Sequence, residues 1–143
     1  MAKGSVQKGD LAPDFVIVEG EDQLLKLSDF RGKSAVVLFF YPKDNSPACS
    51  AEACAFRDSY NDFQEAGAEV IGISDDSSES HEQFAWKLKL PYRLVSDVEG
   101  LIRKLYGVPK TLGLIAGRVT YVIDREGVVQ LVFNSQFQPW KHA

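Results

Sequence analysis

Hydrophobic and polar positions follow one another in blocks that predict a chain of strands and helices. Residues 34–41 are apolar on both faces and rich in β-branched and aromatic side chains, which is typical of a central strand covered on both sides. The other predicted strands are residues 14–18, 24–27, 69–74, 93–96, 119–123 and 128–133. The first two of these flank Gly20 and predict an N-terminal β-hairpin, and the last two predict a second hairpin.

Three segments between the strands predict helices. Residues 47–66 form the longest, which we expect to end at Gly67, and residues 81–88 and 100–106 form shorter ones. Strand–helix–strand–helix followed by a hairpin is the order of a thioredoxin-like α/β fold, with a mixed central sheet and helices on both faces. Because no repeat or linker interrupts the pattern, we expect a single domain over residues 1–143.

Composition is that of a globular domain. Hydrophobic residues make up 45% and charged residues 25% of the 143 positions. No apolar run approaches the roughly 20 residues of a membrane-spanning helix, so we expect no membrane partner. Sixteen basic and twenty acidic residues are interspersed, which leaves no basic stripe for nucleic acid. The two cysteines are typical of a protein from a reducing compartment.

Cys49 is the first candidate for chemistry. It falls in the first turn of the long predicted helix, directly after the central strand, where the free N–H groups of a helix start favour a thiolate. An apolar stripe at helical spacing runs through Cys49, Ala53, Phe56, Tyr60 and Phe63. We expect this stripe to face the sheet, which shelters Cys49 from water.

Cys54 lies about 140° around the helix from Cys49, on the side of Asp58, Asn61 and Glu65. We expect it to face water, so two inert core thiols fit this pattern poorly. In an intact helix, residues five apart have Cα atoms roughly 8.7 Å apart, whereas disulfides rarely tolerate more than about 7 Å. A disulfide between Cys49 and Cys54 therefore requires the first turns of the helix to unwind.

Other polar and aromatic residues indicate no second site. The two histidines and two cysteines lack metal-binding spacings, so we expect no metal, and His81 is interpreted as a solvated helix residue. Asp75 and Asp76 precede a helix that they or the following serines would cap. Residues 103–104 are interpreted as a solvated helix face. The core is expected to include Phe84, Trp86, Leu88 and Leu90.

Residues 41–54 resemble the peroxiredoxin signature, in which a proline, a threonine or serine, and a cysteine recur at fixed spacing. Pro42, Ser46 and Cys49 match it. A second cysteine five positions on, here Cys54, is similar to the peroxiredoxin Q branch, also called bacterioferritin comigratory protein. Further matches lie in residues 53–58, 117–124 and 134–139. The last of these stretches is most similar to plant and cyanobacterial members.

The resemblance implies a role for each residue of the signature. Cys49 would be the peroxidatic cysteine, which a peroxide oxidises to a sulfenic acid. Cys54 would resolve that acid into an intramolecular disulfide. Ser46 would hydrogen-bond the peroxide, and Pro42 would shield the thiolate from water.

The resemblance also indicates which cation would stabilise the Cys49 thiolate. Lys43 is the only basic residue in the immediate loop, so a charge that stabilises the Cys49 thiolate must come from elsewhere. By resemblance, Arg118 would stabilise the thiolate and the departing oxygen, and it stands at the head of a predicted strand. Glu52, three residues past Cys49, would orient Arg118.

Four features depart from the family pattern. Ala48 stands where glycine is common and Ser46 where threonine is common, so we expect the peroxide rate to differ. Residues 115–117, Ile-Ala-Gly, replace a Leu-Pro-Gly turn, which we expect to be looser. Relatives usually continue into a final helix after a segment like 138–142, so we expect that helix to be truncated or absent here.

Together with these patterns, the resemblance implies a monomeric thiol peroxidase for hydrogen peroxide and organic hydroperoxides, recycled by a thioredoxin-type reductant and without a cofactor. The expected location is a chloroplast or a cyanobacterial cytoplasm. Two alternatives stay open. A thiol–disulfide oxidoreductase is disfavoured because such enzymes use Cys-x-x-Cys, whereas four residues separate the cysteines here. A redox-sensing binding module would use the same disulfide without rapid turnover.

Overall fold

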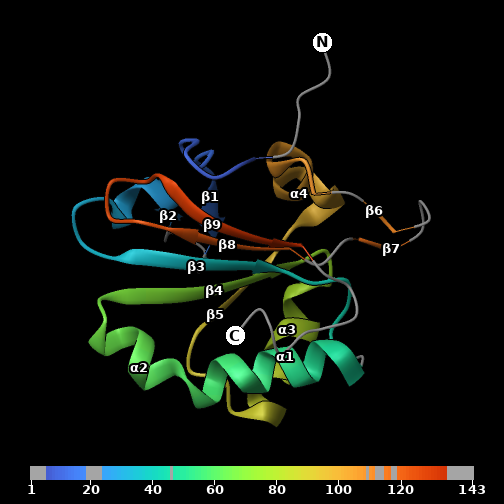
Figure 1. The fold of residues 1–143 in the computed structure, drawn as a ribbon. Helices are drawn as coiled ribbons and strands as arrows, with labels where there is room; N and C mark the ends of the chain where they lie inside the picture. The colour runs from blue at the N-terminus through green and yellow to red at the C-terminus, as the bar shows by residue number, and fades with distance from the viewer. Residues whose placement is uncertain are drawn as a thin grey trace.

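A central sheet carries helices on both faces in the computed structural model of the chain (Figure 1), which describes residues 6–18, 24–45, 47–108, 110–111, 115–116 and 119–134. The strands are β1 (Val16–Val18), β2 (Leu24–Lys26), β3 (Ala35–Phe40), β4 (Ala68–Ser74), β5 (Arg93–Ser96), β6 (Lys110–Thr111), β7 (Ile115–Ala116), β8 (Val119–Ile123) and β9 (Val129–Asn134). The helices are α1 (Pro47–Asp58), α2 (Tyr60–Glu65), α3 (Ser78–Leu88) and α4 (Leu101–Tyr106), with 3-10 turns η1 (Leu27–Phe30) and η2 (Val98–Gly100). Of the helices described, none has the length and apolar character needed to cross a bilayer.

The main sheet is mixed and has β3 at its centre. Its strand order is β5-β4-β3-β8-β9. β3 runs parallel to β4 and antiparallel to β8, and the edges are added by parallel β5 and antiparallel β9. The predicted N-terminal hairpin is confirmed as the antiparallel pair β1–β2, and the predicted second hairpin as β8–β9.

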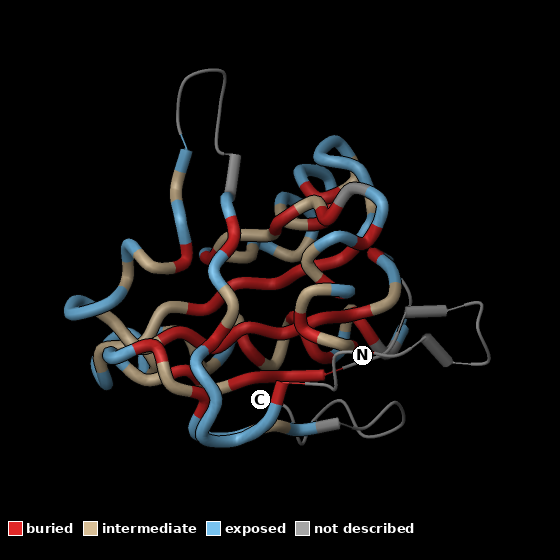
Figure 2. The backbone as a smooth tube through the Cα atoms, turned by 90° about the horizontal axis from the view of Figure 1, so that it is seen from above, coloured by how far each residue is buried: buried red, intermediate tan, exposed pale blue. Residues whose placement is uncertain are grey.

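Both faces of β3 are buried, because successive side chains of a strand point to opposite sides. Val36, Leu38 and Phe40 belong to the cluster shared with α4, and Val37 and Phe39 to the cluster shared with α1 and α3. Figure 1 shows α1, α2 and α3 below the sheet and α4 above it. In Figure 2 the buried backbone follows the central strands, and exposed residues gather in the turns. The two-sided apolar pattern of residues 34–41 thus predicted the central strand correctly.

Two helices differ from the predicted ranges. The long helix is interrupted at Ser59, whose ψ of 3° leaves the helical region, so that α1 and α2 replace one helix over 47–66. It still ends where expected, since Gly67 has φ +79°, a conformation that favours glycine. α3 begins three residues earlier than predicted because the Ser77 hydroxyl caps it, accepting a hydrogen bond from the Ser80 N–H at 3.1 Å.

Two side chains lie where the sequence pattern did not place them. Trp86 was expected in the core, but it is 84% exposed. It stands two residues past the buried Phe84, about 200° around α3, and therefore on the opposite face. Arg103 was interpreted as solvated, but it is buried, and its backbone N–H donates to the Asp97 carboxylate at 2.9 Å. Lys104 is exposed as expected.

Tyr92 fastens α1 to the sheet. It precedes β5, and its ring meets Phe39 of β3 edge-on, with the ring centroids 5.8 Å apart. Its buried hydroxyl donates to the carbonyl of Ala53 at 2.8 Å, in the middle of α1. On the other face of the sheet, the Tyr106 hydroxyl donates to the carbonyl of Pro13 at 2.7 Å. Both tyrosines thus donate one hydrogen bond to a backbone carbonyl, Tyr92 to α1 and Tyr106 to the segment before β1.

We expect Tyr92→Phe to lower the free energy of unfolding by about 1 kcal/mol, the usual contribution of one buried hydrogen bond. Tyr106→Phe is the matched control and loses a similar amount. Only Tyr92→Phe should speed amide hydrogen exchange in α1, because only its hydroxyl contacts that helix. Exchange measured by mass spectrometry tests this, and equal exchange of α1 in the two variants would show that Tyr92 does not hold it.

Candidate active site

Cys49 lies at the start of α1, where the loop from the carboxyl end of β3 enters the helix. Its side chain is 1% exposed and packs in the cluster that contains Tyr41, Ala53 and Phe56. The predicted stripe is confirmed, since Tyr60 and Phe63 pack against the same cluster. The sheltered position of Cys49 therefore follows from the apolar spacing of the helix.

Cys54 is half-buried and occupies different surroundings. It lies close enough to Arg57 and Tyr92 to act electrostatically on both. Both cysteines are free thiols, and both belong to the one continuous helix α1. As derived above, an intact helix keeps their Cα atoms too far apart for a disulfide. The structure therefore shows the reduced arrangement, with the two sulfurs in environments of different polarity.

Glu52 is buried at the same end of α1, between the two cysteines in sequence. The residue is 0% exposed, and a carboxylate so buried requires hydrogen-bond donors or a cation. Burial, together with the nearby Glu52 and Cys54, raises the pKa of Tyr92 far above its usual range. The Tyr92 hydroxyl therefore stays protonated and remains a donor to Ala53.

The structure places four of the six predicted site residues. Pro42 is half-buried in the loop that leaves β3, and Cys49, Glu52 and Cys54 lie on α1. This loop and the helix start bring Pro42 and Cys49 to one end of the sheet. Ser46 and Arg118 lie outside the described residues, as do Gly117 and the segment after Asn134.

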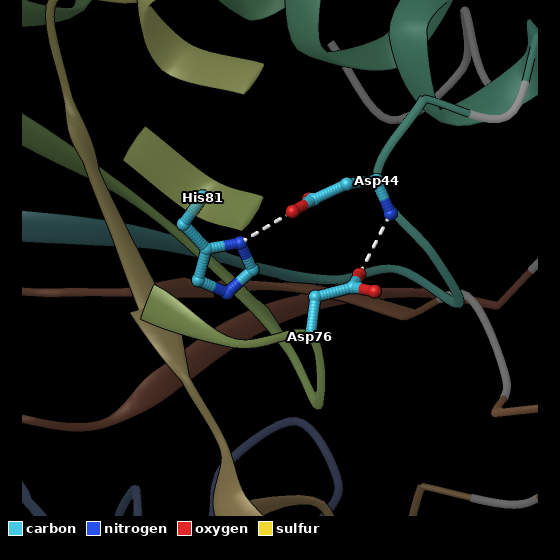
Figure 3. Close-up of side chains that lie close together, drawn as sticks. All are labelled: Asp44, Asp76 and His81. Atoms are coloured by element: carbon cyan, nitrogen blue, oxygen red, sulfur yellow. Dashed lines mark hydrogen bonds and ion pairs between the residues drawn. The ribbon is translucent and has the colours of Figure 1, made fainter. Parts of the chain in front are cut away.

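Asp44, in the same loop, anchors a buried hydrogen-bond network that the sequence did not reveal. One carboxylate oxygen, Oδ1, accepts from the Tyr41 hydroxyl at 2.7 Å. The other, Oδ2, lies 2.8 Å from Nδ1 of His81 and accepts from the Ser80 hydroxyl at 2.7 Å. The Asp44 N–H donates to Asp76 at 2.7 Å (Figure 3). The loop before Cys49 is thus tied to Tyr41 directly after β3, to α3 and to the turn after β4.

The network favours an ion pair between His81 and Asp44. Burial by itself lowers the pKa of His81, but the hydrogen bond and charge of Asp44 outweigh it, so this pKa lies above the ordinary 6.5. Burial raises the pKa of Asp44, but hydrogen bonds from His81, Tyr41 and Ser80 hold it below the ordinary 3.8. Burial and the neighbouring Asp44 raise the pKa of Tyr41 far above its usual range, so its hydroxyl stays a donor.

Asp44, Asp76 and His81 are also close enough to be considered as metal ligands. One atom from each lies within 4.8 Å of the others. These atoms already have protein partners, because Asp76 Oδ2 accepts from Asp44 N–H and from the Ser74 hydroxyl at 2.8 Å. The second ring nitrogen of His81 lies 3.1 Å from the carbonyl of Val95. Hydrogen bonding alone accounts for the proximity of these three residues.

The interpretation of His81 as a solvated residue is wrong, since it is 4% exposed. One signal would have placed it inward: His81 precedes the buried Phe84 by three residues and so shares its helix face. Its partner was not readable, because Asp44 is 37 residues away and comes from a loop. His81 lies outside residues 41–54, and Asp44 lies within them but is not one of the matched positions Pro42, Ser46 and Cys49.

Comparison with known proteins assigns the family. Residues 8–132 match the AhpC/TSA family. The chain is 56% identical over 138 residues to "Peroxiredoxin Q, chloroplastic" of Sedum lineare, which covers 96% of this chain and 74% of that protein. It spans only 64% of the length of several other plant relatives of that name.

Solved structures agree in fold. The chain is similar to peroxidoxin BcpB from Mycobacterium tuberculosis, with 35% identity, a TM-score of 0.86, and coverage of 96% of this chain and 91% of that one. It is also similar to the bacterioferritin comigratory protein of Xanthomonas campestris, with 29% identity, a TM-score of 0.73, and coverage of 78% and 74%. These matches confirm the expected thioredoxin-like fold. The chain belongs to the AhpC/TSA family and, within it, to the peroxiredoxin Q branch.

Proposed function

We propose that this chain is a thiol peroxidase that reduces hydrogen peroxide and organic hydroperoxides with Cys49. The observation that carries the proposal is the position of Cys49, a reduced and buried thiol in the first turn of α1 beyond the carboxyl end of β3. Helix N–H groups at that end favour an anionic sulfur, which is the nucleophile. The similar Xanthomonas campestris protein is described in terms of alkyl peroxide reduction.

The reaction balances with the two thiols of the chain and an external reductant. The Cys49 thiolate attacks the terminal oxygen of the peroxide, an S–O bond forms and the O–O bond breaks. The leaving oxygen takes a proton and departs as an alcohol, or as water from hydrogen peroxide, and Cys49 becomes a sulfenic acid. Cys54 then attacks the sulfenic sulfur, which forms the disulfide and releases water. A thioredoxin-type dithiol supplies the two electrons and two protons that restore both thiols.

The disulfide step couples this chemistry to a change of shape. Cys49 and Cys54 lie in the first two turns of α1, so the proposed disulfide requires those turns to unwind. The hydrogen bond from Tyr92 to Ala53 lies between them and must break or shift when they do. Oxidation is therefore expected to loosen α1, and reduction to restore it.

Arg118 is the proposed cation of the site. Two observations on other residues support this role. Val119, the next residue, pairs with Phe40 at the end of β3 from which the loop to Cys49 departs. Glu52 is a fully buried carboxylate on α1, the kind of group that orients a guanidinium. Arg118 would stabilise both the Cys49 thiolate and the charge on the leaving oxygen.

Ser46 and Pro42 complete the proposed site. The hydroxyl of Ser46 would donate a hydrogen bond to the peroxide. Ser46 lies in sequence between the anchored Asp44 and Cys49. Pro42 is half-buried in that loop, and its ring would exclude water from the sulfur. We further propose that the protein acts as a monomer, with a hydroperoxide and a thioredoxin-type reductant as its partners. The names of the plant relatives favour a chloroplast location.

We expect Cys49→Ser to abolish peroxide reduction, since it removes the nucleophile. Cys54→Ser should be oxidised once per molecule and then stop. It lacks the second thiol that converts the sulfenic acid into the disulfide that thioredoxin reduces. Peroxide titration with mass spectrometry of the two thiols measures the first oxidation. A thioredoxin-coupled assay measures turnover.

Activity retained in Cys49→Ser, or normal turnover in Cys54→Ser, would contradict these assignments. The same preparations distinguish the alternatives. Faster reaction with a protein disulfide than with peroxide would favour a thiol–disulfide oxidoreductase. Oxidation without reductant-dependent turnover would favour a redox sensor.

Arg118→Ala should lower the second-order rate constant for peroxide roughly 100-fold, as removal of one preorganised charge donor commonly does. Arg125→Ala is the control, because Arg125 is an exposed cation in the β8–β9 turn. It should stay within about twofold of the wild type, since exposed charges are strongly screened. Circular dichroism verifies the fold, and equal rates for the two variants would remove Arg118 from the site.

A further inference from the structure

Asp44 fixes the loop that carries the proposed peroxide site. Its side chain bonds to Tyr41, Ser80 and His81, and its backbone N–H bonds to Asp76. Four residues then lead to Cys49. The first of them, Asn45, has φ +64°, a left-handed conformation that non-glycine residues rarely adopt unless the surroundings hold them in it. The buried anchor at Asp44 directly precedes this turn.

The ring of His81 is enclosed by hydrogen-bond acceptors. Nε2 lies 3.1 Å from the Val95 carbonyl, which can only accept, so Nε2 must carry a proton. Nδ1 lies 2.8 Å from Asp44 Oδ2, which already accepts from the Ser80 hydroxyl. With Asp44 ionised, Nδ1 must carry a proton as well. The geometry thus matches a charged imidazolium that links β5 to the loop.

The two carboxylates that face the ring favour this charge. Tyr41, at the end of β3, stays neutral because burial raises its pKa. Asp44 from the loop and Asp76 from the turn after β4 contribute negative charge, and β5 contributes the Val95 carbonyl. Loss of one His81 proton would leave one ring nitrogen facing an acceptor in a buried site, either Nδ1 toward the Asp44 carboxylate or Nε2 toward the Val95 carbonyl, and both are unfavourable.

We propose that His81 is a positioning residue for Cys49, and that its protonated ring holds the 42–45 loop in the geometry that the peroxide reaction requires. The inference rests on the proposed peroxidase function. His81 does not touch the peroxide in this proposal, and it acts through Asp44. Deprotonation of His81 loosens the loop, so the reaction rate falls at alkaline pH.

The pH window follows from the two pKa directions. The His81 pKa is raised, so the stabilising ion pair is complete below 6.5 and is lost as the pH rises through the raised value. The Asp44 pKa is lowered, so the pair is retained above 3.8 and is lost as the pH falls through the lowered value. The loop is therefore fastened between these two limits and is released as the pH rises through the raised His81 pKa.

The test is the pH profile of the second-order rate constant of the reduced protein with hydrogen peroxide, measured by stopped-flow competition with a reference peroxidase. We expect an alkaline decline in the wild type, with the same midpoint as the NMR titration of the His81 ring. The chain has two histidines, so a His142→Asn variant assigns the signals. This wild-type measurement needs no substitution at the buried site.

His81→Gln removes the charge and should lower the rate constant about tenfold at neutral pH, within the range that small misplacements of a reacting group cause. It should also abolish the alkaline decline. Asp44→Asn should behave similarly, and the double variant should be no slower than either single one, because the pair acts as a unit. Glu82→Gln, an exposed charge beside His81 on α3, should leave rate and profile unchanged.

The outcomes separate this inference from the function it rests on. Absence of a peroxide reaction at Cys49 in the wild type refutes the proposed function, and the inference with it. A wild type that reacts with peroxide but shows no decline matching the His81 titration overturns the inference alone. An unchanged profile in a folded His81→Gln variant also overturns it. Thermal unfolding of each variant distinguishes loss of positioning from loss of the fold.

Discussion

The packing of α1 onto Phe39 is the contact on which the site depends. Phe39 stands in the middle strand, and its ring stacks on Phe56 of α1 with the centroids 4.6 Å apart. The same ring meets Tyr92, whose hydroxyl reaches the α1 backbone. These contacts set the depth and direction of the helix and so carry Cys49 into the cluster at its start. A helix that starts after a strand is common in α/β folds. Without these contacts, that position alone would not bury the sulfur of Cys49.

Much of this arrangement was readable from local patterns. The two-sided apolar run of 34–41 predicted β3, and the helical spacing from Cys49 to Phe63 predicted which thiol would be buried. These predictions succeed because strand and helix periodicity report directly on which faces are covered. Resemblance to a short signature added roles that spacing alone does not give, above all for Arg118.

The failures have physical origins that hydrophobic periodicity does not report, and at His81 the origin is a contact between distant segments. His81 was interpreted as solvated because a histidine among polar residues is usually exposed, whereas the acid that draws it inward comes from the loop before α1. Arg103 is buried in a short helix whose first turn is held by Asp97. Trp86 failed in the opposite direction, since it was expected in the core and is exposed. α3 packs on the sheet with the face that carries Phe84, and Trp86 lies on the other face. Charge partners across the fold leave no periodic trace in the sequence.

The interruption at Ser59 bears on what happens when α1 opens. α2 has its own attachment to the sheet, since the Tyr60 hydroxyl donates to Glu69 of β4 at 2.7 Å. Unwinding that begins at Pro47 therefore stops at α2, which is docked separately. It does not continue through one uninterrupted series of helical hydrogen bonds. The opening that the proposed disulfide requires is therefore expected to be subglobal and confined to the cysteine-bearing helix. In the proposed oxidation cycle, unwinding of the first turns of α1 would leave α2 and α3 on the same face of the sheet, which limits the apolar surface from which chains aggregate.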